Sequence, residues 1–239
     1  RGVHHALYFP GSMQLGDTFQ TCQALFQCFC SRGGHFEQQA VRRLQAGQSR
    51  CEVVVQGSNQ AYDRCVIAAG AWSGQLLHDL GLKVPLAAER GYHLTLPRLK
   101  GVPRHVLSST DRNVVISPLD CGLRIVGIGE HGRLESAPVE KRYRQLGHHL
   151  EQLLAGVDAS VPEASTWMGI RPTLPDSLPV IDRHPEHPQI GMVFGHQHLG
   201  VTQAAISARL IRALMLEGGS SRAWKPFSDL NTAFRVTRF

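Results

Sequence analysis

The sequence predicts an α/β fold of the α+β kind, in which a mixed strand–helix layer accompanies a separate antiparallel sheet. Strands and helices alternate up to Pro85, whereas short β-runs follow one another in series after it. A third observation is the apolar run Ile190–Phe194, which leads through a glycine-bounded turn into a helix. With 239 residues, 42% of them hydrophobic, the chain can bury a core in one or two domains.

The first element is a helix. Asp17 is a suitable N-cap, apolar side chains then recur at helical spacing, and Gly33–Gly34 ends the helix; the recurring side chains are Cys22, Leu25, Phe26 and Phe29. We expect this helix to pack into the core. Two strands follow, Glu52–Gln56 and Tyr62–Ala68, which are separated by a turn at residues 57–59.

The segment Ala68-Ala69-Gly70 runs from the second strand into a helix that begins near Trp72. Small residues here permit close approach either of neighbouring backbone or of a ligand. From the residues alone, a tightly packed strand-to-helix turn and a cofactor contact are equally good interpretations.

The middle of the chain contains the serial strands Tyr92–Leu96, Asn113–Ser117 and Leu123–Ile128. A helix from Pro138 to Gly156 follows, and its leucines predict that it covers one face of the sheet. Residues 127–132 read GIGEHG, a literal GxGxxG. A dinucleotide-binding turn needs its third glycine in the first turn of a helix, but here the helix starts only at Pro138. We therefore expect a loop or strand end in place of a phosphate site.

The last part of the chain places Gly195–Gly200 between the strand Ile190–Phe194 and a helix that carries Ile206, Leu210 and Leu214 on one face. The N-terminus of a helix offers unpaired backbone N–H groups and the positive end of a dipole. Such a turn suits a phosphate, a carboxylate or the electron-rich edge of a reduced flavin.

The composition and the charge distribution predict which partners the protein binds and where in the cell it lies. The net charge of +6 is scattered, with no basic run longer than two residues, so no nucleic acid is expected. No apolar run approaches the ~20 residues of a membrane span. Of the six cysteines, four lie in apolar runs, which predicts buried free thiols in a reducing compartment. We expect a cytoplasmic protein, whose positive charge allows peripheral contact with the inner membrane.

A metal site is not expected, although the chain has 13 histidines. The spacing of His184, His187, His196 and His198 in a proline-rich stretch matches no common ligand set.

Two motifs in order carry a resemblance. GIRPTLPDSLPVI, followed by FGHQHLGVT, resembles the carboxy-terminal signature of the D-amino-acid oxidase and dehydrogenase family of flavoenzymes, and is most similar to the bacterial D-amino acid dehydrogenases. Residues 64–97 and 6–36 resemble earlier parts of the same family. The resemblance implies a partial FAD-binding Rossmann-like layer, residues 1–85 and 166–239, and an antiparallel-sheet substrate domain with a covering helix, residues 86–165. It also implies the carboxy-terminal part of a longer flavoenzyme, without the amino-terminal Rossmann unit.

The resemblance also implies roles for individual residues. Arg171 matches the arginine that binds the substrate carboxylate. The residues implied beside FAD are Ala69, Gly70, Trp72, Gly195, His196, Gln197, His198, Leu199, Gly200 and Thr202. Without the resemblance, Arg171 would be interpreted as a structural partner of Asp176, and His196 as a residue that holds a turn. Two residues depart from the family pattern, because Gln197 and Asp182 stand where it prefers glycine. Gln197 is expected either to crowd the flavin ring or to take a positive φ, which is uncommon for a residue other than glycine. Asp182 is expected to alter the loop near the cofactor.

The implied function is FAD-dependent oxidation of the Cα–N bond of a D-amino acid or a similar small amino acid to the imino acid and then the 2-oxo acid. The electron acceptor is either oxygen or a quinone-linked chain. Two alternatives remain open: a flavin-dependent RNA-modifying domain of the same fold, and a non-catalytic remnant.

Overall fold

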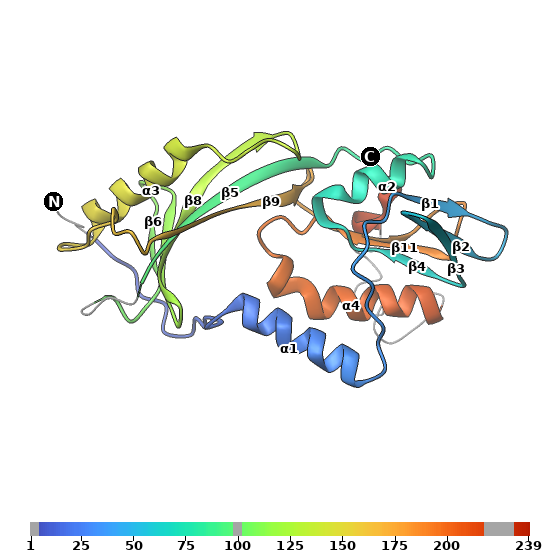
Figure 1. Ribbon diagram of the computed structural model, residues 1–239, viewed down its shortest axis with the longest axis horizontal. Helices are drawn as coiled ribbons and strands as arrows, with labels where there is room; N and C mark the ends of the chain where they lie inside the picture. The colour runs from blue at the N-terminus through green and yellow to red at the C-terminus, as the bar shows by residue number, and fades with distance from the viewer. Residues whose placement is uncertain (1–4, 98–101, 218–231) are drawn as a thin grey trace. The chain divides into compact units, whose positions relative to one another are not determined.

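The computed structural model describes residues 5–97, 102–217 and 232–239 (Figure 1). The chain forms two compact units. Unit 1 comprises Arg1–Phe36, Arg90–Glu130 and Ser136–Gly169; unit 2 comprises Glu37–Glu89, His131–Glu135 and Ile170–Phe239. The functional division expected from the sequence, at residues 85 and 166, remains a prediction.

Unit 2 contains a small mixed sheet in the order β10-β11-β4. β11 (Ile190–Phe194) pairs in parallel with β4 (Cys65–Ile67) and antiparallel with β10 (Val180–Arg183). Helix α4 (Gly200–Glu217) follows β11 and packs on this sheet, where Leu210 and Leu214 are buried in a cluster with Ile181 of β10 (Figure 1). The predicted strand Ile190–Phe194 and the helix after it are thus confirmed.

A second sheet of unit 2 is the antiparallel meander β1-β2-β3. β2 (Cys51–Val55) pairs with both β1 (Arg43–Ala46) and β3 (Ser58–Tyr62). The expected turn at residues 57–59 is too long, because Val55 already pairs with Ser58 and only Gln56-Gly57 lie between them. β1 was not predicted from the sequence.

After β4, the chain passes through a short 3₁₀ turn, η1 (Gly70–Trp72), into helix α2 (Ser73–His78). The helix expected near Trp72 is therefore present. Its Leu77 is fully buried with Ile67, Met192 and Phe194, so the ends of β4 and β11 share one core with α2.

The five-stranded sheet has the order β6-β7-β8-β5-β9. Its strands are β5 (Ala87–Leu96), β6 (Leu107–Ser109), β7 (Val114–Leu119), β8 (Gly122–Gly132) and β9 (Ser165–Thr173). β7 and β8, which correspond to two of the predicted β-runs, pair antiparallel as expected. β6, which was not predicted, pairs antiparallel with β7. Helix α3 (Glu140–Leu153) covers one face, because its Tyr143, Leu146 and Leu150 are buried with Leu94, Ile116 and Ile125 of the sheet.

The GIGEHG segment lies within β8, and α3 begins only at Glu140. The prediction that these glycines form no dinucleotide-binding turn is confirmed at the level of local structure. Gly127 is required by packing instead, because a Cβ there would lie 2.7 Å from the carbonyl oxygen of Asn113, which immediately precedes β7.

Helix α1 (Thr18–Ser31) has the predicted cap, since Asp17 accepts hydrogen bonds from the backbone N–H groups of Phe19 and Gln20. The expectation that it packs into the core is wrong for the described residues, because none of its side chains is buried; Phe26 and Phe29 are about half exposed. Its cysteines and Cys121 are exposed as well, so the expectation of buried thiols holds only for Cys51 and, in part, Cys65.

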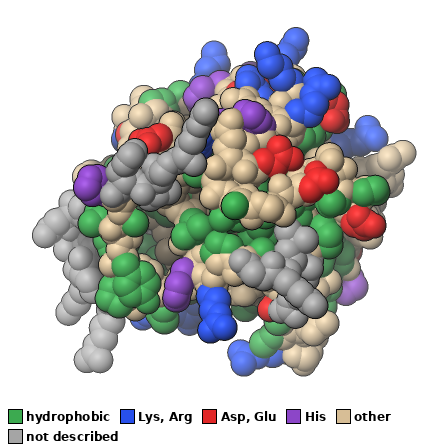
Figure 2. All heavy atoms as spheres, turned by 90° about the vertical axis from the view of Figure 1, so that its left-hand side faces the viewer, with side chains coloured by type: hydrophobic (Ala, Val, Ile, Leu, Met, Phe, Trp, Pro, Cys, Tyr) green, Lys and Arg blue, Asp and Glu red, His purple; other side chains and the backbone are tan. Residues whose placement is uncertain are grey.

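Surface charge is mixed where it can be seen. Figure 2 shows one face of the molecule, on which Lys and Arg side chains gather near the upper edge and recur at the lower edge, with Asp and Glu side chains scattered between them. Among the helices described, none has the length and apolar character needed to cross a membrane.

Candidate functional site

The candidate site in unit 2 lies at the carboxyl ends of two neighbouring parallel strands. Ile67 near the end of β4 pairs with Met192 of β11, so the turns that follow these strands leave the same edge of the sheet. One turn carries Ala69 and Gly70, and the other begins at Gly195. In open sheets of this kind, ligands bind outside the carboxyl ends of the strands.

The turn Gly195–Gly200 contains two residues with positive φ, Gly195 and Gln197. Gly195 has a φ of 86°, and a Cβ on it would lie 2.4 Å from Cδ1 of the buried Leu174. Gln197 has a φ of 50°, which is one of the two alternatives that its position in the family pattern left open. The N–H of Gln197 donates to the carbonyl oxygen of Pro172 at 3.2 Å, which ties the turn to the end of β9.

The first turn of α4 has backbone N–H groups that are not hydrogen-bonded within the described part of the chain. The backbone N–H groups of Gly200, Val201 and Thr202 have no hydrogen-bond partner among the described residues, and all three residues are exposed. His198 and Leu199 of the turn are exposed as well. Because these N–H groups carry the positive end of the helix dipole, they fit the electron-rich N1–C2=O edge of a reduced flavin.

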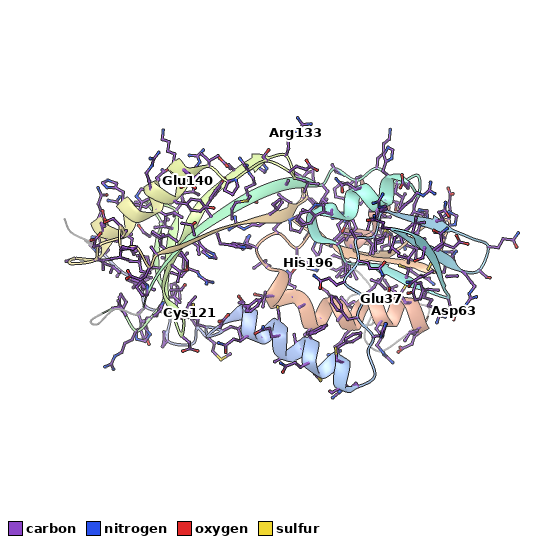
Figure 3. The ribbon with its side chains drawn as sticks, viewed as in Figure 1. Glu37, Asp63, Cys121, Arg133, Glu140 and His196 are labelled. Atoms are coloured by element: carbon purple, nitrogen blue, oxygen red, sulfur yellow. The ribbon has the colours of Figure 1, made fainter. Side chains whose placement is uncertain are left out.

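His196 lies at the entry to α4 (Figure 3). Its Nε2 is 2.8 Å from Oγ of Ser207, a residue of α4 that is almost fully buried. Burial lowers the pKa of His196, so the ring is neutral at pH 7. This contact supports the interpretation that His196 holds the turn against its helix.

The other predicted cofactor residues, Ala69, Gly70 and Trp72, lie in η1 and just before it. Gly70 has a φ of 54°, and the Trp72 side chain is about half exposed. The adjacent Ser73 is buried, and its Oγ has no partner among the described residues. The parallel pairing of β4 with β11 brings this segment to the same sheet edge as Gly195, although no hydrogen bond joins the two turns in the described part of the chain.

Arg171 lies on β9 and is held by an ion pair. Its Nη1 donates to Oε1 of Glu89 at 2.9 Å, and Oγ1 of Thr173 donates to the other carboxylate oxygen at 2.9 Å. Burial would raise the pKa of Glu89, but the hydrogen bonds from Thr173 and Arg171 outweigh it and keep that pKa below its usual value. Glu89 is therefore ionised at neutral pH and fixes the guanidinium in place.

The remaining donors of Arg171, Nε and Nη2, have no partner in the part of the chain that the structure describes, and the side chain is 30% exposed. The guanidinium can thus donate hydrogen bonds to a second carboxylate while it remains bonded to Glu89. Sequence reasoning missed Glu89 and Thr173. The only available signal was that a partly buried arginine needs a counter-ion, and the sequence does not say which.

The structural interpretation of Arg171 named the wrong partner. Asp176 pairs with Arg238, at 2.6 Å from Nε to Oδ2 and 3.2 Å from Nη2 to Oδ1, and not with Arg171. Asp182 lies within β10 and not in a loop, and its Oδ2 accepts the backbone N–H of Val236 at 3.0 Å. Its carboxylate therefore serves the carboxy-terminal segment.

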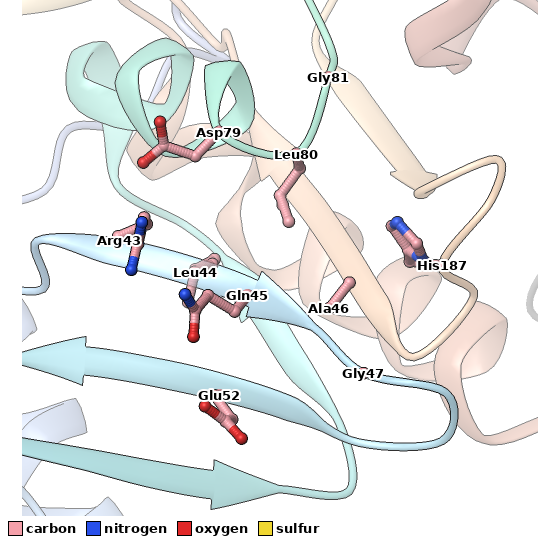
Figure 4. Close-up of a pocket in the computed structure, with 10 residues that line it drawn as sticks. All are labelled: Arg43, Leu44, Gln45, Ala46, Gly47, Glu52, Asp79, Leu80, Gly81 and His187. Carbon is pink, nitrogen blue, oxygen red and sulfur yellow. The ribbon is translucent and has the colours of Figure 1, made fainter.

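A cavity of about 640 Å³ in unit 2 lies elsewhere (Figure 4). It is lined by β1 and Gly47 after it, by Glu52 of β2, by residues 79–81 after α2, and by His187, and none of the predicted site residues borders it. The described residues contain no cluster of ligands for a metal ion. Two of the four histidines considered from the sequence have other partners: Nε2 of the buried His184 is 3.0 Å from the carbonyl oxygen of Leu80, and His196 contacts Ser207.

Comparison with known proteins gives consistent matches. Residues 1–214 match the family described as FAD dependent oxidoreductase. The chain is 34% identical over 185 residues to a D-amino-acid oxidase of Bradyrhizobium diazoefficiens, which covers 77% of this chain and 44% of that protein. It is 31% identical over 179 residues to a D-amino acid dehydrogenase of Chromohalobacter salexigens, with 73% and 42% covered. The chain thus spans less than half the length of these relatives.

Solved structures show the same fold at low sequence identity. Glycine oxidase from Geobacillus kaustophilus aligns with a TM-score of 0.75 at 20% identity, covering 91% of this chain and 57% of that one. L-proline dehydrogenase from P. horikoshii aligns with a TM-score of 0.74 at 18% identity, covering 92% and 59%.

Proposed function

Because this chain belongs to the family of FAD-dependent oxidoreductases, we propose that it forms part of an enzyme that oxidises the Cα–N bond of a D-amino acid or a similar small amino acid. The names of the two relatives support amino-acid oxidation, and neither favours the RNA-modifying alternative. The observation that carries the proposal is Arg171, whose guanidinium is fixed by Glu89 and retains unpaired donors beside the strand end that is bonded to Gln197.

Arg171 binds the substrate carboxylate. Two parallel N–H···O bonds from Nε and Nη2 to the substrate carboxylate would orient the amino acid. The bond from Nη1 to Glu89 restricts rotation of the Arg171 side chain. Since orientation alone can lower a barrier substantially, no side-chain base is required, and we assign none.

The turn Gly195–Gly200 and the start of α4 hold the flavin ring edge, with Ala69, Gly70 and Trp72 as further contacts from the neighbouring turn. When bound, FAD supplies the group that accepts the hydride from the substrate Cα. The unpaired N–H groups of Gly200, Val201 and Thr202 are fixed in place before the reaction, so they can stabilise negative charge without reorganisation.

The test is Arg171→Leu in the complete enzyme, assayed on D-amino acids with oxygen and with a quinone analogue as alternative acceptors. A charge-assisted hydrogen bond contributes about 1.5–3 kcal/mol, so kcat/KM should fall by about 10- to 150-fold. The matched substrate is the corresponding amine without its carboxylate, whose slower turnover should be nearly unchanged by the substitution. Equal losses on both substrates would show that Arg171 does not bind the carboxylate.

A further inference from the structure

The carboxy-terminal residues of unit 2 are bonded to the loop between β9 and β10. Arg238 donates to both carboxylate oxygens of Asp176 and, at 2.7 Å, to the carbonyl oxygen of Leu178. The Arg238 side chain is only 11% exposed. The same segment is secured by Val236, whose side chain is buried in the core and whose N–H donates to Asp182.

The loop that Arg238 grips contains a residue in an unfavourable conformation. Ser177 has a φ of 63°, in the left-handed region that residues with a Cβ seldom adopt. Its N–H donates to the carbonyl oxygen of Leu174 at 3.0 Å, and the N–H of Leu178 donates to Oδ1 of Asp176 at 3.1 Å. Contacts on both sides of Ser177 thus hold a turn that its own backbone disfavours.

Leu174 connects this loop to the candidate site. Its side chain is fully buried and fills the space next to Gly195, at 2.4 Å from where a Cβ would be. Its carbonyl oxygen accepts the side-chain amide of Gln197 at 3.5 Å, and Gln197 also has positive φ. A displacement of the loop would therefore move the surface on which the turn Gly195–Gly200 rests.

We propose that Arg238 is a positioning residue for the candidate flavin-side turn, acting through Asp176, the 174–178 loop and Leu174. The carboxy-terminal segment holds the loop in place through the bonds of Arg238 to Asp176, and the segment itself is bonded to β10 through Val236 and Asp182. This explains why a carboxylate stands at position 182, where the family pattern has glycine: it binds the N–H of Val236. The inference rests on the proposed function only for its catalytic consequence, because the mechanical coupling can be measured without turnover.

The experiment compares Arg238→Leu with Arg235→Leu, which removes the same charge from the same segment at an exposed side chain without a bonded partner among the described residues. Hydrogen exchange is followed at the amides of Gln197 and Leu199, which donate to Pro172 and His196. Arg238→Leu should accelerate their exchange by about tenfold or more, and Arg235→Leu should not. The amides of β2 serve as reference, since global unfolding would accelerate them equally.

A double-mutant cycle identifies the route. Asp176→Asn keeps the oxygen that accepts from the N–H of Leu178 but loses the charge. In the double variant with Arg238→Leu, the amides of Gln197 and Leu199 should therefore exchange no faster than in the single variants. Arg238→Lys should restore part of the protection. In the complete enzyme, Arg238→Leu should lower kcat more than it raises KM. Unchanged exchange at Gln197, or exchange that rises equally in β2, would overturn the proposal, whereas changed exchange with unchanged kinetics would instead contradict the role assigned to the turn.

Discussion

At the scale of single residues, the candidate site depends on partners that are far apart in the chain. Arg171 and the turn beginning at Gly195 could be identified from the sequence because each belongs to a short local motif. Glu89 could not, because it lies 82 residues from Arg171 and no local pattern marks it. The same reason explains the wrong partner expected for Arg171: Asp176 is near it in sequence, yet it is bonded to Arg238.

Gln197 provides a residue-scale prediction about stability. A left-handed conformation costs a residue with a Cβ about 1–2 kcal/mol, whereas glycine adopts it freely. Gln197→Gly should therefore leave the free energy of unfolding unchanged or raise it by up to about 1 kcal/mol, despite the loss of the long bond to Leu174. Gln197→Val, with a branched Cβ, should lower it by about 1–2 kcal/mol. Urea unfolding of the two variants tests this order, and the reverse order would contradict it.

At the scale of elements, periodicity predicted where helices and strands lie better than what they contact. α1 was correctly placed, from its cap at Asp17 to its end just before Gly33, but its apolar side chains do not enter the core of the described chain. A helix with an apolar face needs a cover, and its own sequence cannot say what that cover is. β1 was missed because four residues are too few to show an alternation.

Contacts between elements of unit 1 give a second prediction. Glu130 of β8 joins Arg90 of β5 to Arg142 of α3, and it also accepts the hydroxyl of the buried Tyr92. Breaking a fully buried ion pair on one side costs about 3–5 kcal/mol. This network is partly buried, with the Glu130 side chain 17% and the Arg142 side chain 34% exposed, so the cost of breaking it should lie at or below the lower end of that range. Glu130→Gln should therefore lower the free energy of unfolding by a few kcal/mol. Glu163→Gln, at an exposed position, is the control and should stay within about 0.5 kcal/mol; similar values for the two variants would show that the network contributes little.

At the scale of the whole molecule, buried titratable groups predict how stability depends on pH. Burial lowers the pKa of His93 to about 4, with a further contribution from Arg124, and it also lowers the pKa of His149, His184 and His196. A histidine whose folded-state pKa lies below its unfolded value of about 6.5 binds more protons in the unfolded state, so stability falls as the pH drops below 6.5.

The carboxylates act in the same direction at lower pH. The pKa of Glu130 is lowered by the Tyr92 hydroxyl and the two arginines, and that of Asp176 by Arg238, so their stabilisation is lost as the pH falls below about 4. Thermal unfolding should therefore show a continuous decline in Tm from pH 7 to pH 3. His93→Gln should flatten the part between pH 6.5 and 4. A Tm that rises on acidification, or the same slope in the variant, would contradict this account.

The parallel pairing of β4 with β11 also has a consequence for the order of events during synthesis. β4 leaves the ribosome before β11, and Ile67 cannot pair with Met192 until the intervening strands and α3 have been made. Unit 1 contains most of those intervening residues and can bury its own core first. The hydrophobic residues of β4 and α2 stay unpaired in the nascent chain until β11 emerges. Pairings between residues so far apart in the sequence also form slowly. Between the emergence of β4 and that of β11, the growing chain therefore exposes Ile67 and Leu77, which are buried together with β11 in the folded protein.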